Sequence, residues 1–143
     1  MESLPFARSY RDLVVYKKQR ALALAVFLQT RRFPSEEKFA LTDQVRRSSR
    51  SIGAQIAEAW AKRRFEKHFI SKLTDADAEC QETQHWLESA KDCEYLTDEE
   101  SSNLLAQCFE IGRMLGGMID NAANFCPQST TVRETPPDLT SDL

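Results

Sequence analysis

The chain has 143 residues, of which only 4 are glycine and 5 are proline, so long uninterrupted helices are possible. Folding a domain of this size buries roughly 70% of the unfolded surface, and such a core needs no metal or disulfide. The longest apolar run, residues 21–28, is far below the roughly 20 residues that cross a bilayer, and no N-terminal signal is visible. We therefore expect a cytoplasmic protein with no membrane partner.

The net charge of −3 hides a division between the two halves of the chain. Residues 1–67 hold 15 Lys/Arg against 7 Asp/Glu, a net charge of +8, whereas residues 68–143 hold 4 against 15, a net charge of −11. Such asymmetry fits a face that binds a polyanion. It fits equally well two halves that pack together and neutralise each other.

The first predicted helix covers residues 10–31 and ends at Phe33-Pro34, because the residue before a proline avoids the α region. Residues 21–28 are apolar almost all round, which is typical of a helix buried on more than one side. We therefore expect Leu24 and Phe27 to contact another subunit. A short helical turn is predicted over residues 35–39.

The second predicted helix covers residues 42–64, with Thr42 as its N-cap and Asp43 in its first turn. A third helix is predicted over residues 65–94, and Thr97 with Glu100 forms a capping-box pattern that opens a fourth. Both later helices carry a 4-3 apolar repeat, which indicates a bundle seam. The seam residues are Phe69, Leu73, Ala76, Cys80, Thr83, Leu87 and Ala90 in the third, and Leu104, Cys108, Ile111, Leu115, Met118, Ala122 and Phe125 in the fourth.

These segments predict an all-α fold, an antiparallel up-down-up-down four-helix bundle, because short connections make consecutive helices run in opposite directions. We assign residues 1–126 to this single domain. Residues 127–143 are rich in Ser, Thr, Pro and Asp with little to bury, and they are predicted to form a disordered tail.

The sequence predicts neither an active site nor a cofactor nor a metal site. His68 and His85 lie 17 residues apart, about 100° apart around a helix, and neither adjoins a Cys or Ser at a spacing that suggests a catalytic pair. The cysteines show no metal-binding spacing and are expected to be small buried residues in a reducing compartment. We therefore expect a protein that is not an enzyme.

Glycine inside a helix costs about 1 kcal/mol relative to alanine, so the internal glycines imply a compensating reason. Gly112 and Gly116 share one side of the fourth helix, and Gly53 with Ala57 forms a similar face on the second. Both faces indicate tight helix packing, and we predict that they contribute to subunit contacts.

The basic residues of the first two helices form the main candidate binding site. Arginine suits phosphate because its planar fork binds two oxygens at once, although no aromatic residue is interleaved with these arginines in the sequence. The alternative is that the same charges pair with the acidic third helix of a neighbouring subunit. The candidate nucleic-acid-binding residues are Arg31, Arg32, Arg46, Arg47, Arg50, Lys62, Arg63 and Arg64.

Residues 41–59 read LTDQVRRSSRSIGAQIAEA, which resembles the LT-QIRRA--SI-ANIAEG signature of the four-helix bundle proteins encoded in 23S rRNA intervening sequences. These are related to the accessory variability proteins of diversity-generating retroelements. Phe33-Pro34 with Glu36 and Glu37 is similar to the FP--E motif of the family. Ala59 replaces its usual glycine, so we expect the second helix to continue through Trp60.

The resemblance implies a bundle that assembles into a ring, typically a pentamer, with a basic surface near its pore or rim. For the retroelement relatives it also implies binding of nucleic acid and of a reverse transcriptase. The sequence thus favours a homo-oligomeric bundle that binds RNA or DNA backbones through helices one and two. The alternative is an oligomeric protein–protein scaffold whose basic and acidic halves pair across subunits.

Overall fold

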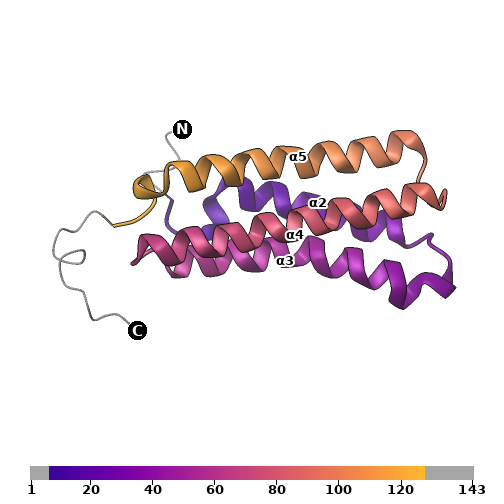
Figure 1. The fold of residues 1–143 in the computed structure, drawn as a ribbon, viewed down its shortest axis with the longest axis horizontal. Helices are drawn as coiled ribbons and strands as arrows, with labels where there is room; N and C mark the ends of the chain where they lie inside the picture. Colours follow the sequence, from indigo (N-terminus) through magenta and orange to yellow (C-terminus); the bar gives the residue numbers. More distant parts are fainter. Residues whose placement is uncertain (1–6, 128–143) are drawn as a thin grey trace.

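Four long helices form the protein in a computed structural model that describes residues 7–127. Each runs opposite to the one before it, and α2 also packs against α5, which closes the bundle (Figure 1). The predicted all-α four-helix bundle is therefore confirmed. The helices are α2 (Val14–Thr30), α3 (Asp43–Ala61), α4 (Glu66–Asp92) and α5 (Asp98–Asp120).

The 4-3 repeats predicted for the third and fourth helices line the core. Every member of the seam on α4 is at most 1% exposed, and the members on α5 are at most 7% exposed. Beyond the end of α5, Ala122 is buried and Phe125 is half-buried. The polar member, Thr83, is satisfied inside the core, because its hydroxyl lies 2.8 Å from Ser48 Oγ and donates to the Glu79 carbonyl at 2.9 Å. A regular heptad spacing was therefore sufficient to locate the centre of the bundle.

The first helix begins later than predicted. Residues 10–12 form a separate 3-10 turn, η1 (Tyr10–Asp12), and Leu13 is extended before α2 starts. Ser9 caps this turn: its hydroxyl accepts from the Arg11 N–H at 3.0 Å, and the Asp12 carboxylate accepts from the Ser9 N–H at 3.2 Å. This local capping box stabilises a turn that the apolar periodicity alone does not reveal.

Thr42 is not the N-cap that the sequence suggested. It has helical φ and ψ of −58° and −51°, and its side chain makes no capping bond. It ends a π-helical turn, η3 (Lys38–Thr42), which follows the 3-10 turn η2 (Ser35–Glu37) and continues directly into α3. The predicted short helical turn is thus present but is fused to the next helix.

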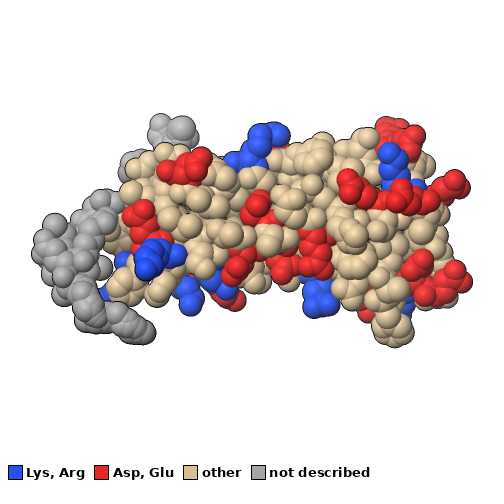
Figure 2. Space-filling view, viewed as in Figure 1, with Lys and Arg blue, Asp and Glu red and all other residues tan. Residues whose placement is uncertain are grey.

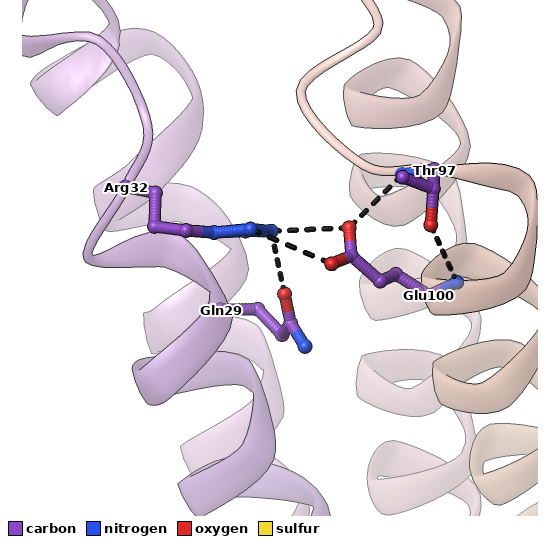
Figure 3. A network of polar contacts seen from close by, with 4 residues as sticks. All are labelled: Gln29, Arg32, Thr97 and Glu100. Carbon is purple, nitrogen blue, oxygen red and sulfur yellow. Dashed lines mark hydrogen bonds and ion pairs between the residues drawn. The ribbon is translucent and has the colours of Figure 1, made fainter.

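The predicted capping box at the start of α5 is confirmed, and it also takes part in a contact between helices (Figure 3). Thr97 Oγ1 accepts from the Glu100 N–H, and Glu100 Oε1 accepts from the Thr97 N–H, both at 3.0 Å. The same carboxylate binds Arg32 from the far end of α2, at 3.1 Å. Gln29 Oε1 accepts from Arg32 Nη2 at 2.7 Å, so the guanidinium is held between the two helices.

The remaining features of the fold concern the ends of the helices and of the chain. α3 continues through Trp60 to Ala61, as expected from Ala59, which is fully buried. A final 3-10 turn, η4 (Ala122–Asn124), follows α5. No helix within residues 7–127 is long and apolar enough to cross a membrane. The predicted tail lies outside the described residues except for Pro127.

Three of the four cysteines are buried, as expected, but Cys93 is exposed at the end of α4. All four are free thiols. Cys80 and Cys108 face each other across the core, with the Cys80 thiol donating to the Cys108 carbonyl at 3.3 Å. Contact with the Cys108 side chain lowers the pKa of Cys80, whereas the Cys80 contact and burial raise the pKa of Cys108.

Candidate nucleic-acid interface

The predicted basic residues form two groups near opposite ends of α3. Arg31 and Arg32 follow α2, next to Arg46, Arg47 and Arg50 at the start of α3, because the two helices are antiparallel. The second group, residues 62–64, follows α3. Eighteen positions separate residues 46 and 64, or about 27 Å at 1.5 Å per residue. The two groups therefore do not form one compact site within a single chain.

Phe27 on α2 is surrounded by three of the predicted arginines. The guanidinium carbons of Arg46, Arg50 and Arg31 lie 4.7, 5.8 and 5.9 Å from its ring centroid. Arg46 is further fixed by a 2.8 Å hydrogen bond from Nε to Thr30 Oγ1. No aromatic residue is interleaved with these arginines along the sequence, but the neighbouring helix supplies one in the fold, Phe27.

Arg47 lies 60–100° around α3 from Arg50 and Arg46, toward α4. Its Nη2 donates to Gln44 Oε1 at 3.2 Å, and its charge acts on Glu79 of α4. Burial, reinforced by Glu82 and Asp75, raises the pKa of Glu79, while Arg47 opposes this shift. Arg47 is thus exposed and close to negative charge, whereas the arginines around Phe27 are not in ion pairs with any described carboxylate.

Two predicted binding residues hold the bundle together. Arg32 forms the ion pair with Glu100 described above. Arg63 is half-buried: its guanidinium carbon lies 3.6 Å from the centre of the Trp60 ring, and Nη1 donates to the Phe125 carbonyl at 3.2 Å. Burial lowers the pKa of Arg63, which is so high that the group stays charged. Their neighbours Arg31, Lys62 and Arg64 are exposed.

Four of the six predicted interface residues line one open groove of about 440 Å³ between α2 and α3. They are Leu24, Phe27, Gly53 and Ala57, and Leu24 is 58% exposed. No carboxylate is among the lining residues, and its charged groups are two guanidiniums. The other lining residues were not predicted from the sequence as interface residues, and Arg50 was predicted only as a phosphate ligand. They are Tyr10, Tyr16, Gln19, Arg20, Ala23, Arg50 and Ala54.

A contact within the chain explains why a glycine, rather than a better helix former, occupies position 53 of α3. A Cβ at this position would lie 2.3 Å from Oε1 of Gln19, whose side chain crosses from α2. Gln19 is only 4% exposed, and its Nε2 donates to the Ser49 carbonyl at 3.0 Å. The glycine thus admits a buried amide that joins α2 to α3, so no second subunit is needed to explain it.

Gly112 and Gly116 lie elsewhere, on α5, and the chain itself does not explain them. The nearest atom to a Cβ at Gly112 is Asp77 Oδ1 at 3.8 Å, and no atom lies within 4 Å of one at Gly116. Phe109, which precedes them by three and seven residues on the same helical face, is 49% exposed. The structure thus separates the predicted interface into two surfaces: the groove and this stripe on α5 (Phe109, Gly112 and Gly116).

The charge of the two halves is only partly neutralised within the chain. Lys18 pairs with Glu110 at 3.2 Å and Arg32 with Glu100, and no other cation of residues 7–67 is ion-paired to a described carboxylate. Acidic side chains gather along the face formed by α4 and α5 (Figure 2). The groove between α2 and α3 therefore keeps an unneutralised positive charge.

The described residues contain no group of His, Cys, Asp and Glu side chains that could hold a metal ion. His68 and His85 are both exposed on α4, and their 17-residue separation corresponds to about 25 Å. His68 packs beside Phe65 and His85 beside Trp86, with ring centroids 5.5 and 4.7 Å apart. The structure therefore does not bring the two histidines together.

Comparison with known proteins agrees with the fold. A crystal structure of a protein with unknown function from the S23 ribosomal protein family of Bacteroides thetaiotaomicron is 34% identical, with a TM-score of 0.67. The match covers 74% of this chain and 98% of that one. No curated protein shows significant similarity. The family model described as 23S rRNA-intervening sequence protein matches residues 11–117, and the chain belongs to this family.

Proposed function

We propose that the protein is a non-enzymatic homo-oligomeric bundle that binds nucleic-acid backbones through Arg31, Arg46, Arg47 and Arg50. The observation that carries this proposal is the group of three guanidiniums around Phe27, none of which is in an ion pair with a described carboxylate. Guanidiniums that are held in place without a carboxylate partner can bind phosphate oxygens.

Self-assembly repeats this basic group. The stripe of Phe109, Gly112 and Gly116 on α5 is exposed or half-buried and leaves room for another helix to approach closely. We propose it as the subunit contact, with the pentamer implied by the sequence resemblance as the favoured assembly. Several copies of one basic group on a single particle raise affinity for a long polyanion well above that of one copy.

Reversing two charges tests the proposal. In the double variant Arg47→Glu, Arg50→Glu, both positions are exposed, so the bundle should remain folded. Wild-type binding to RNA or DNA should weaken steeply and linearly on a plot of log K against log salt, because each neutralised phosphate releases counterions. The variant should lose this binding. Fluorescence anisotropy across a salt series measures both effects.

The matched control is Lys67→Glu, Arg113→Glu, which makes the same change in net charge at two exposed cations of α4 and α5. It should bind almost as tightly as the wild type, since its charges lie outside the proposed site. Equal loss in both double variants would mean that only total charge matters. Unchanged binding by Arg47→Glu, Arg50→Glu would show that neither of these two arginines contributes to the site.

A second candidate function is an oligomeric protein scaffold, and the acidic face of α4 and α5 favours it. In that assembly, the free arginines pair with carboxylates such as Asp75 and Glu82 of a neighbouring subunit. The same charge reversal then disrupts the oligomer. Loss of the oligomer, together with no nucleic-acid binding even at ~50 mM salt, would favour the scaffold.

A further inference from the structure

The α2 wall of the groove alternates aromatic and cationic side chains. Four of its lining residues, Tyr16, Arg20, Leu24 and Phe27, are spaced 4-4-3 and share one face of the helix. Arg31 continues this row four residues later, beyond the lining of the groove. This row of side chains, from Tyr16 to Arg31, is about 22 Å long at 1.5 Å per residue. Its side chains are held in place, since Arg20 Nη1 donates to the Tyr16 hydroxyl at 3.2 Å and guanidiniums surround Phe27.

The α3 side of the groove is lined mainly by small residues. Gly53, Ala54 and Ala57 contribute almost no side-chain volume, so the space between the aromatic rings and α3 stays open. Arg50 and the adjacent Arg46 border this space on α3. A groove lined by aromatic rings and small residues, with cations on both sides, matches a chain that carries flat rings on a charged backbone.

We infer that this groove binds a single strand of nucleic acid, with unpaired bases stacked against Tyr16 and Phe27 and phosphates on Arg20 and Arg50. The inference rests on the proposed function and specifies the form of nucleic acid. No carboxylate lines the groove, so its charge complements the strand along its whole length. Phosphate contacts and base stacking are the two interactions by which proteins hold single strands without reading sequence.

A double helix does not fit the same groove. Neighbouring helix axes in a bundle lie about 8–10 Å apart. A whole duplex is much wider than that, since its major groove alone is about 12 Å wide. The bases of a duplex are stacked on one another, so they cannot reach Tyr16 or Phe27. A duplex can touch only the arginines at the rim.

The test compares one strand with two. The probes are an RNA of about 16 nucleotides without self-complementarity, and the duplex of that RNA with its complement, both at ~50 mM salt. Phe27→Leu retains apolar bulk but removes the aromatic face. We expect it to weaken single-strand binding at least about fivefold, the low end of what a base–aromatic stack contributes, and to leave duplex binding within about twofold. Phe39→Leu, at a 74% exposed ring outside both the groove and the α5 stripe, should change neither.

A second measurement locates the strand directly. An RNA carrying 5-iodouridine forms photochemical crosslinks to aromatic side chains that stack on the base. We expect mass spectrometry to find the crosslinks at Tyr10, Tyr16 or Phe27, which all line the groove. Crosslinks confined to Trp86 or Phe109, outside the groove, would overturn the inference.

The remaining outcomes separate this inference from the proposal beneath it. Equal affinity for both probes, unaffected by Phe27→Leu, would overturn the groove as a single-strand site and leave backbone binding intact. No binding of either probe would overturn both. A change in oligomer size on Phe27→Leu, with binding unaffected, would assign the groove to a second copy of the chain instead.

Discussion

The contact between Gln19 and Gly53 predicts how the two helices that bear the groove are joined. In Gly53→Ala, the new Cβ meets the Gln19 amide at 2.3 to 2.9 Å, so the amide must move. The displaced group loses its bond to the Ser49 carbonyl and leaves a buried polar atom without a partner, a combined cost of about 2–3 kcal/mol. Alanine returns about 1 kcal/mol of helix propensity. The expected net loss in free energy of unfolding is therefore about 1–2 kcal/mol.

A double-mutant cycle isolates this contact from the other effects of the substitution. In a Gln19→Ala background the obstacle is gone, so Gly53→Ala should become stabilising by about 1 kcal/mol. The coupling energy between the two positions should then be about 2–3 kcal/mol. Urea denaturation followed by circular dichroism measures each variant, with all proteins at one concentration because the stability of an oligomer depends on concentration. A coupling near zero would refute the role assigned to Gly53.

Two further predictions concern other parts of the bundle. A Cβ at Gly116 meets no atom within 4 Å in the chain, so Gly116→Ala should stabilise the dilute protein by about 1 kcal/mol. At higher protein concentration, light scattering of this variant should show fewer copies of the 16.4 kDa chain than in the wild type. A particle mass equal to that of the wild type would argue against assembly through α5. The Tyr95 hydroxyl donates to Glu37 Oε2 at 2.8 Å, which raises the pKa of Tyr95 to about 12. Since the folded pKa is the higher one, the stability from this bond is complete below pH ~10 and lost from there to pH ~12. Ultraviolet titration should show a phenol near pH 12 that Tyr95→Phe lacks, and no such difference would contradict the prediction.

Features that depend on a single helix were predictable from the sequence. The 4-3 seams on α4 and α5 follow from spacing within each helix, and the capping box of Thr97 and Glu100 spans only four residues. The late start of α2 was also a local feature, because Ser9 and Asp12 form a capping box around the turn that precedes the helix. This capping box was overlooked in the sequence, although it is as local as that of Thr97 and Glu100. The assignment of Thr42 failed for another reason. A threonine before a helix predicts a cap only if the preceding backbone is not already helical.

Features that depend on two helices were not predictable in the same way. The arginines around Phe27 come together because the end of α2 lies beside the start of α3, and nothing in the spacing of residues 46 and 50 indicates that register. Part of the signal was still present in one helix, since Phe27 and Arg31 are four residues apart. The partner of Gly53 was likewise hidden, because a glutamine on an apolar stripe gives no indication of which glycine it will face.

The net charge of −3 says little about what the groove can bind, because charge acts locally in salt solution. At physiological ionic strength the Debye length is about 8 Å. The acidic face of α4 and α5 lies at least one further helix away from the groove, and bundle helices are about 8–10 Å apart. A phosphate in the groove therefore experiences Arg20 and Arg50 at contact distance and the distant carboxylates only weakly. Arg47 differs, because Glu79 acts on it directly, so its charge is already partly offset. Under the proposed function, the segregation of the two signs onto different faces is what would allow an acidic protein to bind a polyanion.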